Sequence, residues 1–484
     1  MKIKLLFLIT FLPFALCAQT ELMEKQILED YTIFKNILTK SHPSIYEYTT
    51  KPQWDSIFRS FETDVTQIKN SENLFKSMSA MAVNARDVHL RILHPKMNSV
   101  PDMFPLLLKI IDEKLYTDTK DFGIPLGSEI VDIDGFKSQK ILKRMFKYAA
   151  SDGYNVTKKY RQIESEFGIL HYYEFGAKIE YTVTYIKPDN QIDTAIIQSQ
   201  PFQSIGMRTP KRSSYFSAYH HNADKIEHSN NFVQQKLPFV YFIDSIKTAV
   251  LTVNSFSTEP QEFKSILIDI FKEIRSKKAT SLIIDVRQNN GGYRANAITL
   301  FSFISDQPFK QRISESAITS TLIEASYVKN TMSDYTEFFK NYFLNSKEKD
   351  DRWVLTTDRA EEIMKPYKQT FNGKTYVLIG GNTFSAGSAF ALNIKNSTQI
   401  KLFGEETGGG YYFHTGQFPV LYELPNSKIM FNISLVKISH FVKDNAVKMG
   451  GGVLPDVEIN LTQDDLINGI DAQLDYILKR IVKQ

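Results

Sequence analysis

The chain has 484 residues, of which 42% are hydrophobic and 23% charged, and its formal net charge is +4. This length exceeds one compact core and predicts several domains, and the ordinary composition argues against long disordered tracts. The small charge, without a basic cluster rich in aromatics, argues against nucleic acid as a partner. No H-E-x-x-H cluster or phosphate loop ending in GK[ST] occurs, so we expect no metal and no cofactor.

Residues 1–18 predict a secretory signal peptide. Lys2 and Lys4 precede LLFLITFLPFALCA, an apolar run too short to span a bilayer, and cleavage is expected after Ala18. We therefore expect an exported periplasmic or cell-envelope protein without an integral membrane span. Cys17 is the only cysteine, so cleavage leaves no thiol for disulfides. Lipidation of Cys17, which would give a lipoprotein, is the less favoured alternative.

Three regions follow before the last domain. Residues 19–98 predict a helical N-terminal domain that ends in NARDVHLRILHP, where the spacing becomes extended. Residues 99–202 have a strand-like pattern and predict a mainly-β domain, with GSEIVDIDG between turn glycines. The polar residues 203–240 predict a linker.

Residues 241–484 predict an α/β domain. The strand TAVLTVNSF, an amphipathic helix and the strand SLIIDVR form a βαβ unit, which predicts a parallel sheet with a right-handed crossover. The run KTYVLIGG, a serine-containing turn and a further helix repeat the βα pattern, and QIKLFGEET adds another strand.

The turn GNTFSAGSAFA, residues 381–391, crowds small residues around Ser385 and Ser388. A serine on a sharp bend after a buried strand is exposed, and the N–H groups of the following helix face the same space. Attack of a hydroxyl on a carbonyl needs such donors for the developing oxyanion. By itself, the turn is better explained as a helix N-cap serine beside small packing residues.

A second turn and a histidine extend this interpretation. DVRQNNGGY also ends a buried strand, and its Gly291 and Gly292 can expose a backbone N–H. In one parallel sheet both turns lie at the carboxyl ends of strands, where α/β sheets build their sites. Among nine histidines, His89 stands out because Asp87, two residues earlier, can orient its imidazole.

Six motifs occur in order: RDVHLRI, GSEIVDIDG, LIIDVRQNNGG, TFSAGSAFA, GEETGGG and GVLPD. Together they resemble the tail-specific and tricorn-core serine peptidases, also called the C-terminal-processing peptidases. The resemblance implies a ClpP/crotonase-like catalytic domain preceded by a PDZ-like domain, to which GSEIVDIDG is similar. It also implies a serine peptidase that cleaves extended or unfolded polypeptides.

The resemblance also implies roles for individual residues. Ser385 matches the nucleophile, the N–H of Ala386 matches one oxyanion donor, and Gly291 or Gly292 provides the other. The lysine base of the processing branch falls on Gly410, whereas the histidine of the tricorn-like branch matches His89. The resemblance is therefore closest to the tricorn-core-like branch, with a Ser385–His89 pair.

Two positions depart from that branch: Val88 stands where it has a serine, and Met449 where it has a glutamate. Asp87, Glu405 or Asp444 are the candidates to orient His89 instead. Two alternatives remain open at this point. Beside the serine peptidase, these are a catalytically degenerate peptide-binding protein and a hydrolase of non-peptide acyl substrates on the same scaffold.

Overall fold

The computed structural model describes residues 21–97, 99–215, 237–343, 351–355, 362–397, 399–445 and 447–483. The predicted signal peptide with Cys17 and residues 216–236 of the predicted linker lie outside these residues. Within the described ranges, no helix is both long and apolar enough to cross a membrane.

Three helices open the described chain: α1 (Glu24–Ser41), α2 (Lys51–Asp64) and α3 (Ser71–Ala82). They confirm the predicted helical segment. Their apolar faces pack into one hydrophobic core with β16 (Phe413–Glu423) and β17 (Met430–His440), where the ring of Phe34 meets that of Phe431 edge-on at 5.0 Å. The N-terminal helices therefore share their core with strands from the last quarter of the chain.

These two long strands belong to an antiparallel sheet of order β12-β16-β17-β11-β13. The remaining members are β11 (Arg312–Ala317), β12 (Val328–Thr331) and β13 (Trp353–Val354), and helix α9 (Tyr335–Tyr342) lies between the last two in the chain. Strand β1 (Arg91–Leu93) pairs antiparallel with β17. This pairing fixes the segment that carries His89 to the sheet.

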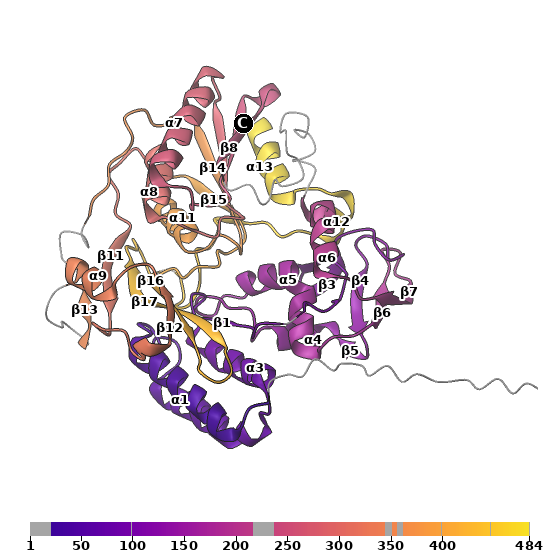
Figure 1. The fold of residues 1–484 in the computed structure, drawn as a ribbon. Helices are drawn as coiled ribbons and strands as arrows, with labels where there is room; N and C mark the ends of the chain where they lie inside the picture. The colour runs from indigo at the N-terminus through magenta and orange to yellow at the C-terminus, as the bar shows by residue number, and fades with distance from the viewer. Residues whose placement is uncertain are drawn as a thin grey trace, which may run out of the picture.

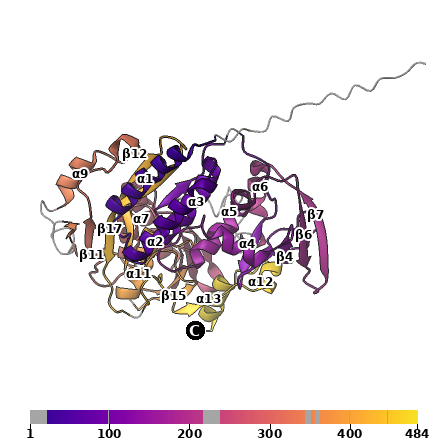
Figure 2. The same ribbon diagram turned by 90° about the horizontal axis from the view of Figure 1, so that it is seen from below.

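A second antiparallel sheet has the order β2-β3-β4-β6-β7, with β5 paired to β4. Its strands are β2 (Leu108–Ile111), β3 (Lys114–Thr117), β4 (Glu129–Ile133), β5 (Phe136–Lys137), β6 (Glu180–Ile186) and β7 (Ile192–Gln198). The strand-like prediction missed two helices here, α4 (Ser138–Met145) and α5 (Thr157–Phe175). The PDZ-like assignment stays a prediction. Figures 1 and 2 place β6 and β7 at the opposite side of the molecule from α1 and β17.

The predicted linker contains regular structure at both ends. Helix α6 (Phe202–Arg208) begins it, and strand β8 (Phe239–Ile243) overlaps its end. The linker prediction from polar composition was therefore too long, because short helices and edge strands also carry polar residues.

The third sheet has the order β18-β15-β14-β10-β9-β8. Its strands are β8, β9 (Thr248–Thr252), β10 (Ser281–Asp285), β14 (Lys374–Ile379), β15 (Lys401–Gly404) and β18 (Val457–Glu458). All neighbours are parallel except β8 and β9, which confirms the predicted βαβ units. The ClpP/crotonase-like detail of this α/β domain stays a prediction.

Helices cover both faces of this sheet. One core contains the apolar faces of α7 (Pro260–Ser276), α8 (Arg294–Ser302) and α11 (Ala386–Ser397). A smaller core on the other face contains α13 (Ala472–Val482), which follows α12 (Gln463–Asn468). Because β10 and β14 run parallel as neighbours, the turns that follow them meet at one sheet edge.

Candidate active site

Ser385 lies in the turn between β14 and α11 and has a φ of +54°. This left-handed conformation is uncommon for a residue with a side chain, and such strain gathers at functional sites. Two backbone bonds hold the bend, because the N–H of Phe384 donates to the carbonyl of Asn289 at 2.9 Å and that of Ala389 donates to the carbonyl of Ser385 at 3.0 Å. The side chain is partly exposed.

Two glycines leave room around this serine. A Cβ on Gly291 would lie 2.7 Å from Cβ of Ser385, and a Cβ on Gly409 would lie 2.6 Å from Oγ of Ser388 and 3.2 Å from the nitrogen of Ser385. Real Cβ contacts are essentially never as short as the first of these distances. Gly291, in the turn after β10, and Gly409, in the loop after β15, are therefore required by the close packing around the serine turn.

The predicted oxyanion donors differ in their hydrogen bonding. The N–H of Gly291 donates to Oδ1 of Asn289 at 2.9 Å, so it is already engaged. Among the described residues, the N–H groups of Gly292 and Ala386 have no acceptor. Of the two glycines, Gly292 therefore has the donor that remains free.

Ser388 is buried rather than exposed. Its hydroxyl donates to the carbonyl of Thr383 at 2.9 Å and accepts from the N–H of Gly409 at 3.1 Å. Ser388 thus ties the serine turn to the 408–410 glycine loop, whereas Ser385 is the hydroxyl left near the surface.

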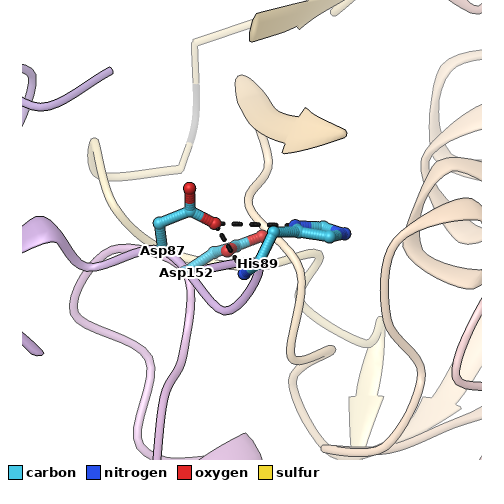
Figure 3. Close-up of side chains that lie close together, drawn as sticks. All are labelled: Asp87, His89 and Asp152. Carbon is cyan, nitrogen blue, oxygen red and sulfur yellow. Dashed lines mark hydrogen bonds and ion pairs between the residues drawn. The ribbon is translucent and has the colours of Figure 1, made fainter. Parts of the chain in front are cut away.

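His89 lies against the serine turn. Its ring centroid is 5.0 Å from that of Phe384, the residue before Ser385. Nδ1 of His89 is 3.5 Å from Oδ1 of Asp87, and the same oxygen accepts the backbone N–H of His89 at 2.8 Å (Figure 3). The structure therefore brings together Asp87, His89 and the turn of Ser385, which come from opposite halves of the chain.

Asp87 is held by two further donors. Thr415 on β16 donates its hydroxyl to Oδ2 at 2.6 Å, and Nε2 of His42 lies 2.9 Å from the same oxygen. Nδ1 of His42 accepts the N–H of Ser44 at 3.2 Å, so the neutral imidazole carries its proton on Nε2, facing Asp87. These contacts fix the carboxylate that faces His89.

The pKa values of this pair are displaced in opposite directions. Burial raises the pKa of Asp87, but bonds from His42 and His89 outweigh it and hold the pKa well below its usual range. Burial lowers the pKa of His89, but the bond to Asp87 and its charge raise it more, so the pKa lies above 6.5. Asp87 is therefore still ionised at the pH at which His89 takes up a proton.

Asp152 is a third member of this cluster. One ligand atom from each of Asp87, His89 and Asp152 lies within 4.8 Å of the others (Figure 3). Oδ1 of Asp152 accepts the N–H of Val88 at 3.1 Å, and Oδ2 accepts that of Gly410 at 3.1 Å. Asp152 thus joins the histidine segment to the glycine loop beside the serine. Burial and the charge of Asp87 raise its pKa to about 7.

The last domain is the part of the chain that matches a known protein family. The family model described as Peptidase family S41 matches residues 247–459, which contain both turns of the site. Residues 247–459 therefore form a peptidase family S41 domain. The chain is a serine-type peptidase, a hydrolase of polypeptides. A search of curated proteins finds no match to the chain.

Solved structures extend the likeness beyond the S41 domain. Mature CPAF complexed with lactacystin has a TM-score of 0.64 at 15% identity, over 95% of this chain and 98% of that chain. Mature CPAF alone has the same score and identity, over 95% and 96% of the two chains. The photosystem II D1 C-terminal processing protease has a TM-score of 0.41 at 13% identity, over 93% and 98%. The CPAF likeness concerns the fold of nearly the whole chain.

Gly410, where one branch of S41 peptidases has its lysine, cannot carry a side chain without rearrangement. A Cβ there would lie 2.3 Å from the carbonyl oxygen of Phe413. We predict that Gly410→Lys does not restore activity to His89→Ala and lowers stability by about 1–3 kcal/mol through overpacking. Peptidase assays and thermal melts of the single and double variants test this. Activity regained in the double variant would contradict it.

The other family positions contribute no orienting group. Val88 is buried, and Met449 is 50% exposed. Glu405 lies 3.6 Å from Nε of Arg161, and Asp444 accepts a bond from the hydroxyl of Tyr411 at 3.2 Å. Of the three carboxylates suggested by the sequence, Asp87 is the one placed against His89.

A change at Asp152 is expected to alter the pH dependence of stability. Its pKa is about 7 when folded and 3.8 ordinarily, so the folded state binds more protons between these values. The stability that Asp152 contributes is complete below the lower value and is lost as pH rises through the higher one. We predict that Asp152→Asn gains in Tm relative to wild type between about pH 5 and about pH 8. An equal difference in Tm at both pH values would contradict this.

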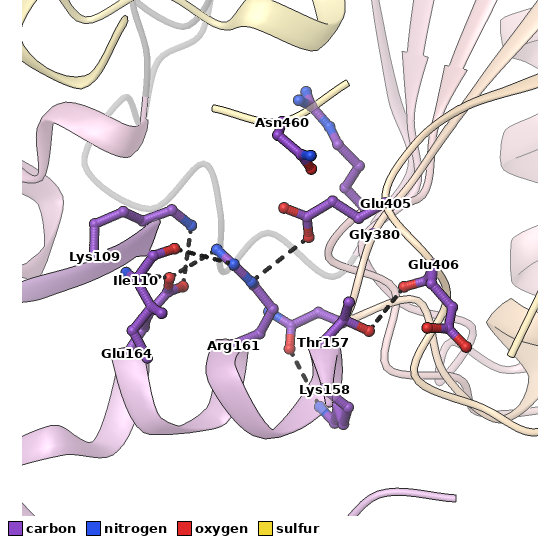
Figure 4. A network of polar contacts seen from close by, with 12 residues as sticks. Lys109, Ile110, Thr157, Lys158, Arg161, Glu164, Gly380, Glu405, Glu406 and Asn460 are labelled. Atoms are coloured by element: carbon purple, nitrogen blue, oxygen red, sulfur yellow. Dashed lines mark hydrogen bonds and ion pairs between the residues drawn. The ribbon is translucent and has the colours of Figure 1, made fainter. Parts of the chain in front are cut away.

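A cavity of about 970 Å³ opens beside the site. Its lining includes His89, Phe384 and Asn290 from the candidate site, together with Lys158 and Arg161 of α5. Figure 4 shows α5 directing Arg161 and neighbouring polar groups toward the glutamates that follow β15. A cavity of this size accommodates several residues of a peptide.

Sequence reasoning missed four residues of this site: His42, Asp152, Lys158 and Thr415. His42, Asp152 and Lys158 lie more than 200 residues before Ser385, and Thr415 lies 30 residues after it on β16, so tertiary folding brings each of them to the site. The sequence contained one indication for His42, because this residue opens HPSIYEY directly after a helix, where an imidazole can hydrogen-bond to a neighbouring polar group. Nothing in the local patterns identified the other three.

Proposed function

We propose that this S41 peptidase is exported and cleaves extended or unfolded polypeptides through Ser385 and His89. His89 removes the proton of the Ser385 hydroxyl as it attacks the carbonyl carbon, and then protonates the leaving amine. Water hydrolyses the acyl-enzyme with His89 again acting as base. Asp87 holds the imidazole with its proton on Nδ1, which leaves Nε2 free to act.

The observation that carries the proposal is the conformation of Ser385. Its φ of +54° places the hydroxyl on a bend between two glycine turns and ahead of the first turn of α11. The free N–H groups of Ala386 and Gly292 support an oxyanion hole, because the developing charge needs donors fixed in advance. The hydrogen bonds of Asp87 support His89 as the base rather than a degenerate, peptide-binding site.

Labelling with a fluorophosphonate tests the nucleophile directly. Wild type is expected to be labelled, and Ser385→Ala and His89→Ala are expected to lose the label. Ser276→Ala is a matched control, because Ser276 is an exposed serine at the end of α7. Label retained by Ser385→Ala, or absent from a wild type that binds unfolded peptides without cleaving them, would overturn the proposal.

A further inference from the structure

Most cations that line the cavity are paired with carboxylates. Lys109 and Arg161 contact Glu164 at 3.0 and 2.7 Å, and Arg161 also approaches Glu405 (Figure 4). Arg287 lies 2.6 Å from Asp285 and 2.7 Å from Asp471. These pairs neutralise the wall of the cavity that lies between α5 and the third sheet.

Lys158 differs from these cations. Its Nζ donates to Oδ1 of Asn290 at 3.3 Å and to Oδ1 of Asn382 at 3.2 Å, and it lies 5.7 Å from the ring centroid of Phe384. No carboxylate of the described residues lies within 4.0 Å of this ammonium. An ammonium that faces only neutral amides keeps the capacity to bind an anion.

Arg91 is a second such cation in the same cavity. It is exposed at the start of β1, and within the described part of the chain no carboxylate pairs with it. Its charge lowers the pKa of both His89 and Lys158, so its field reaches both groups. Two cations without a carboxylate partner among the described residues therefore line the same cavity as the candidate base.

The surroundings of Lys158 disfavour its charge. Burial lowers its pKa to about 8, although the charges of Glu166 and Asp152 act in the opposite direction. A carboxylate brought against Nζ would offset this cost of desolvation, since a partly buried charge is stabilised by a hydrogen-bonded partner of opposite sign.

We infer that Lys158 binds a carboxylate of the substrate next to the scissile bond, with Arg91 adding to the positive potential. The inference rests on the proposed function of Ser385. Asn290 and Asn382 belong to the two turns that surround Ser385, so an anion held by Lys158 lies beside the reacting carbonyl. The carboxylate is either an acidic side chain near the cleaved bond or the α-carboxylate of a chain end.

Matched peptides separate these two sources. In the first pair both ends are blocked, and one peptide has Glu where the other has Gln. This pair is made for each position next to the cleaved bond in turn. The second pair has a neutral sequence with a free or an amidated carboxyl terminus. For each pair, the ratio of kcat/KM between the anionic and the neutral peptide is measured. Wild type is expected to favour the anionic peptide in one pair by about 10- to 100-fold, as for a hydrogen bond between charged groups.

Three variants test the residue. Lys158→Met is expected to bring the ratio near one, chiefly by raising KM for the anionic peptide, and Lys158→Arg to retain most of it. Lys159→Met is the matched control, because Lys159 neighbours it on α5, has a pKa that burial also lowers to about 8, and donates instead to the carbonyl of Phe146. This control is expected to keep the wild-type ratio.

The outcomes separate this inference from the function on which it rests. A wild type that cleaves no peptide would overturn the proposed function itself. An active wild type with a ratio near one in both pairs would overturn only the role of Lys158. An equal loss of kcat with both peptides in Lys158→Met, with an unchanged Tm, would also overturn it and indicate that Lys158 acts in the chemistry.

Discussion

Ser385→Ala is expected to abolish proteolysis, with kcat/KM lower by on the order of 10⁴- to 10⁶-fold. No other described hydroxyl combines exposure, a left-handed bend and adjacent free N–H groups, so no neighbour can replace the nucleophile. Alanine keeps the same φ of +54°, so the backbone cost is unchanged and the Tm should stay near that of wild type. Cleavage of a fluorescently labelled unfolded protein, together with thermal melting, measures both effects.

Ser388→Ala provides the contrast within the same turn. It removes one hydrogen bond to the carbonyl of Thr383 and one from the N–H of Gly409, both buried, and should cost about 1–3 kcal/mol of stability. The nucleophile remains, so labelling of Ser385 should persist in the folded protein. If Ser385→Ala retained cleavage while Ser388→Ala lost it without a fall in Tm, the two serines would have to exchange roles.

The parts of the site that the sequence predicted are local. The turns after β10 and β14 each follow a buried strand directly, and Asp87 precedes His89 by two residues. Parallel pairing of neighbouring strands then brings the turns together without further information. Strand, turn and glycine patterns were therefore sufficient for Ser385, the glycines and the βαβ units.

The parts that were missed depend on contacts across the chain. Asp152 reaches Val88 and Gly410 from a turn between α4 and α5, and Thr415 reaches Asp87 from β16. A single aspartate or threonine has no pattern that reveals such a partner. Helix α5 was missed for a different reason, because a non-helical residue, Glu166, interrupts it and weakens its apolar periodicity.

Asp87→Asn is expected to lower kcat by about 10²- to 10⁴-fold without removing either member of the Ser385–His89 pair. The carboxylate accepts bonds from Thr415, His42 and the backbone of His89, and its charge favours the protonated imidazole. An amide offers one acceptor oxygen in place of two and places an NH₂ group against one of these donors. The imidazole would lose both its orientation and its electrostatic support.

The pH profile separates this role from a loss of fold. His89 acts as a base only when neutral, and its raised pKa places the acid limb of kcat/KM above 6.5 in wild type. Without the charge of Asp87, burial and the charge of Arg91 lower that pKa, so the limb should move to lower pH. Glu405→Gln and Asp444→Asn are the matched controls and should leave the limb in place, because their carboxylates contact Arg161 and Tyr411. A limb that moves with either control but not with Asp87→Asn would assign the orienting carboxylate to that residue, and His89 would then have to turn away from Asp87 when substrate binds.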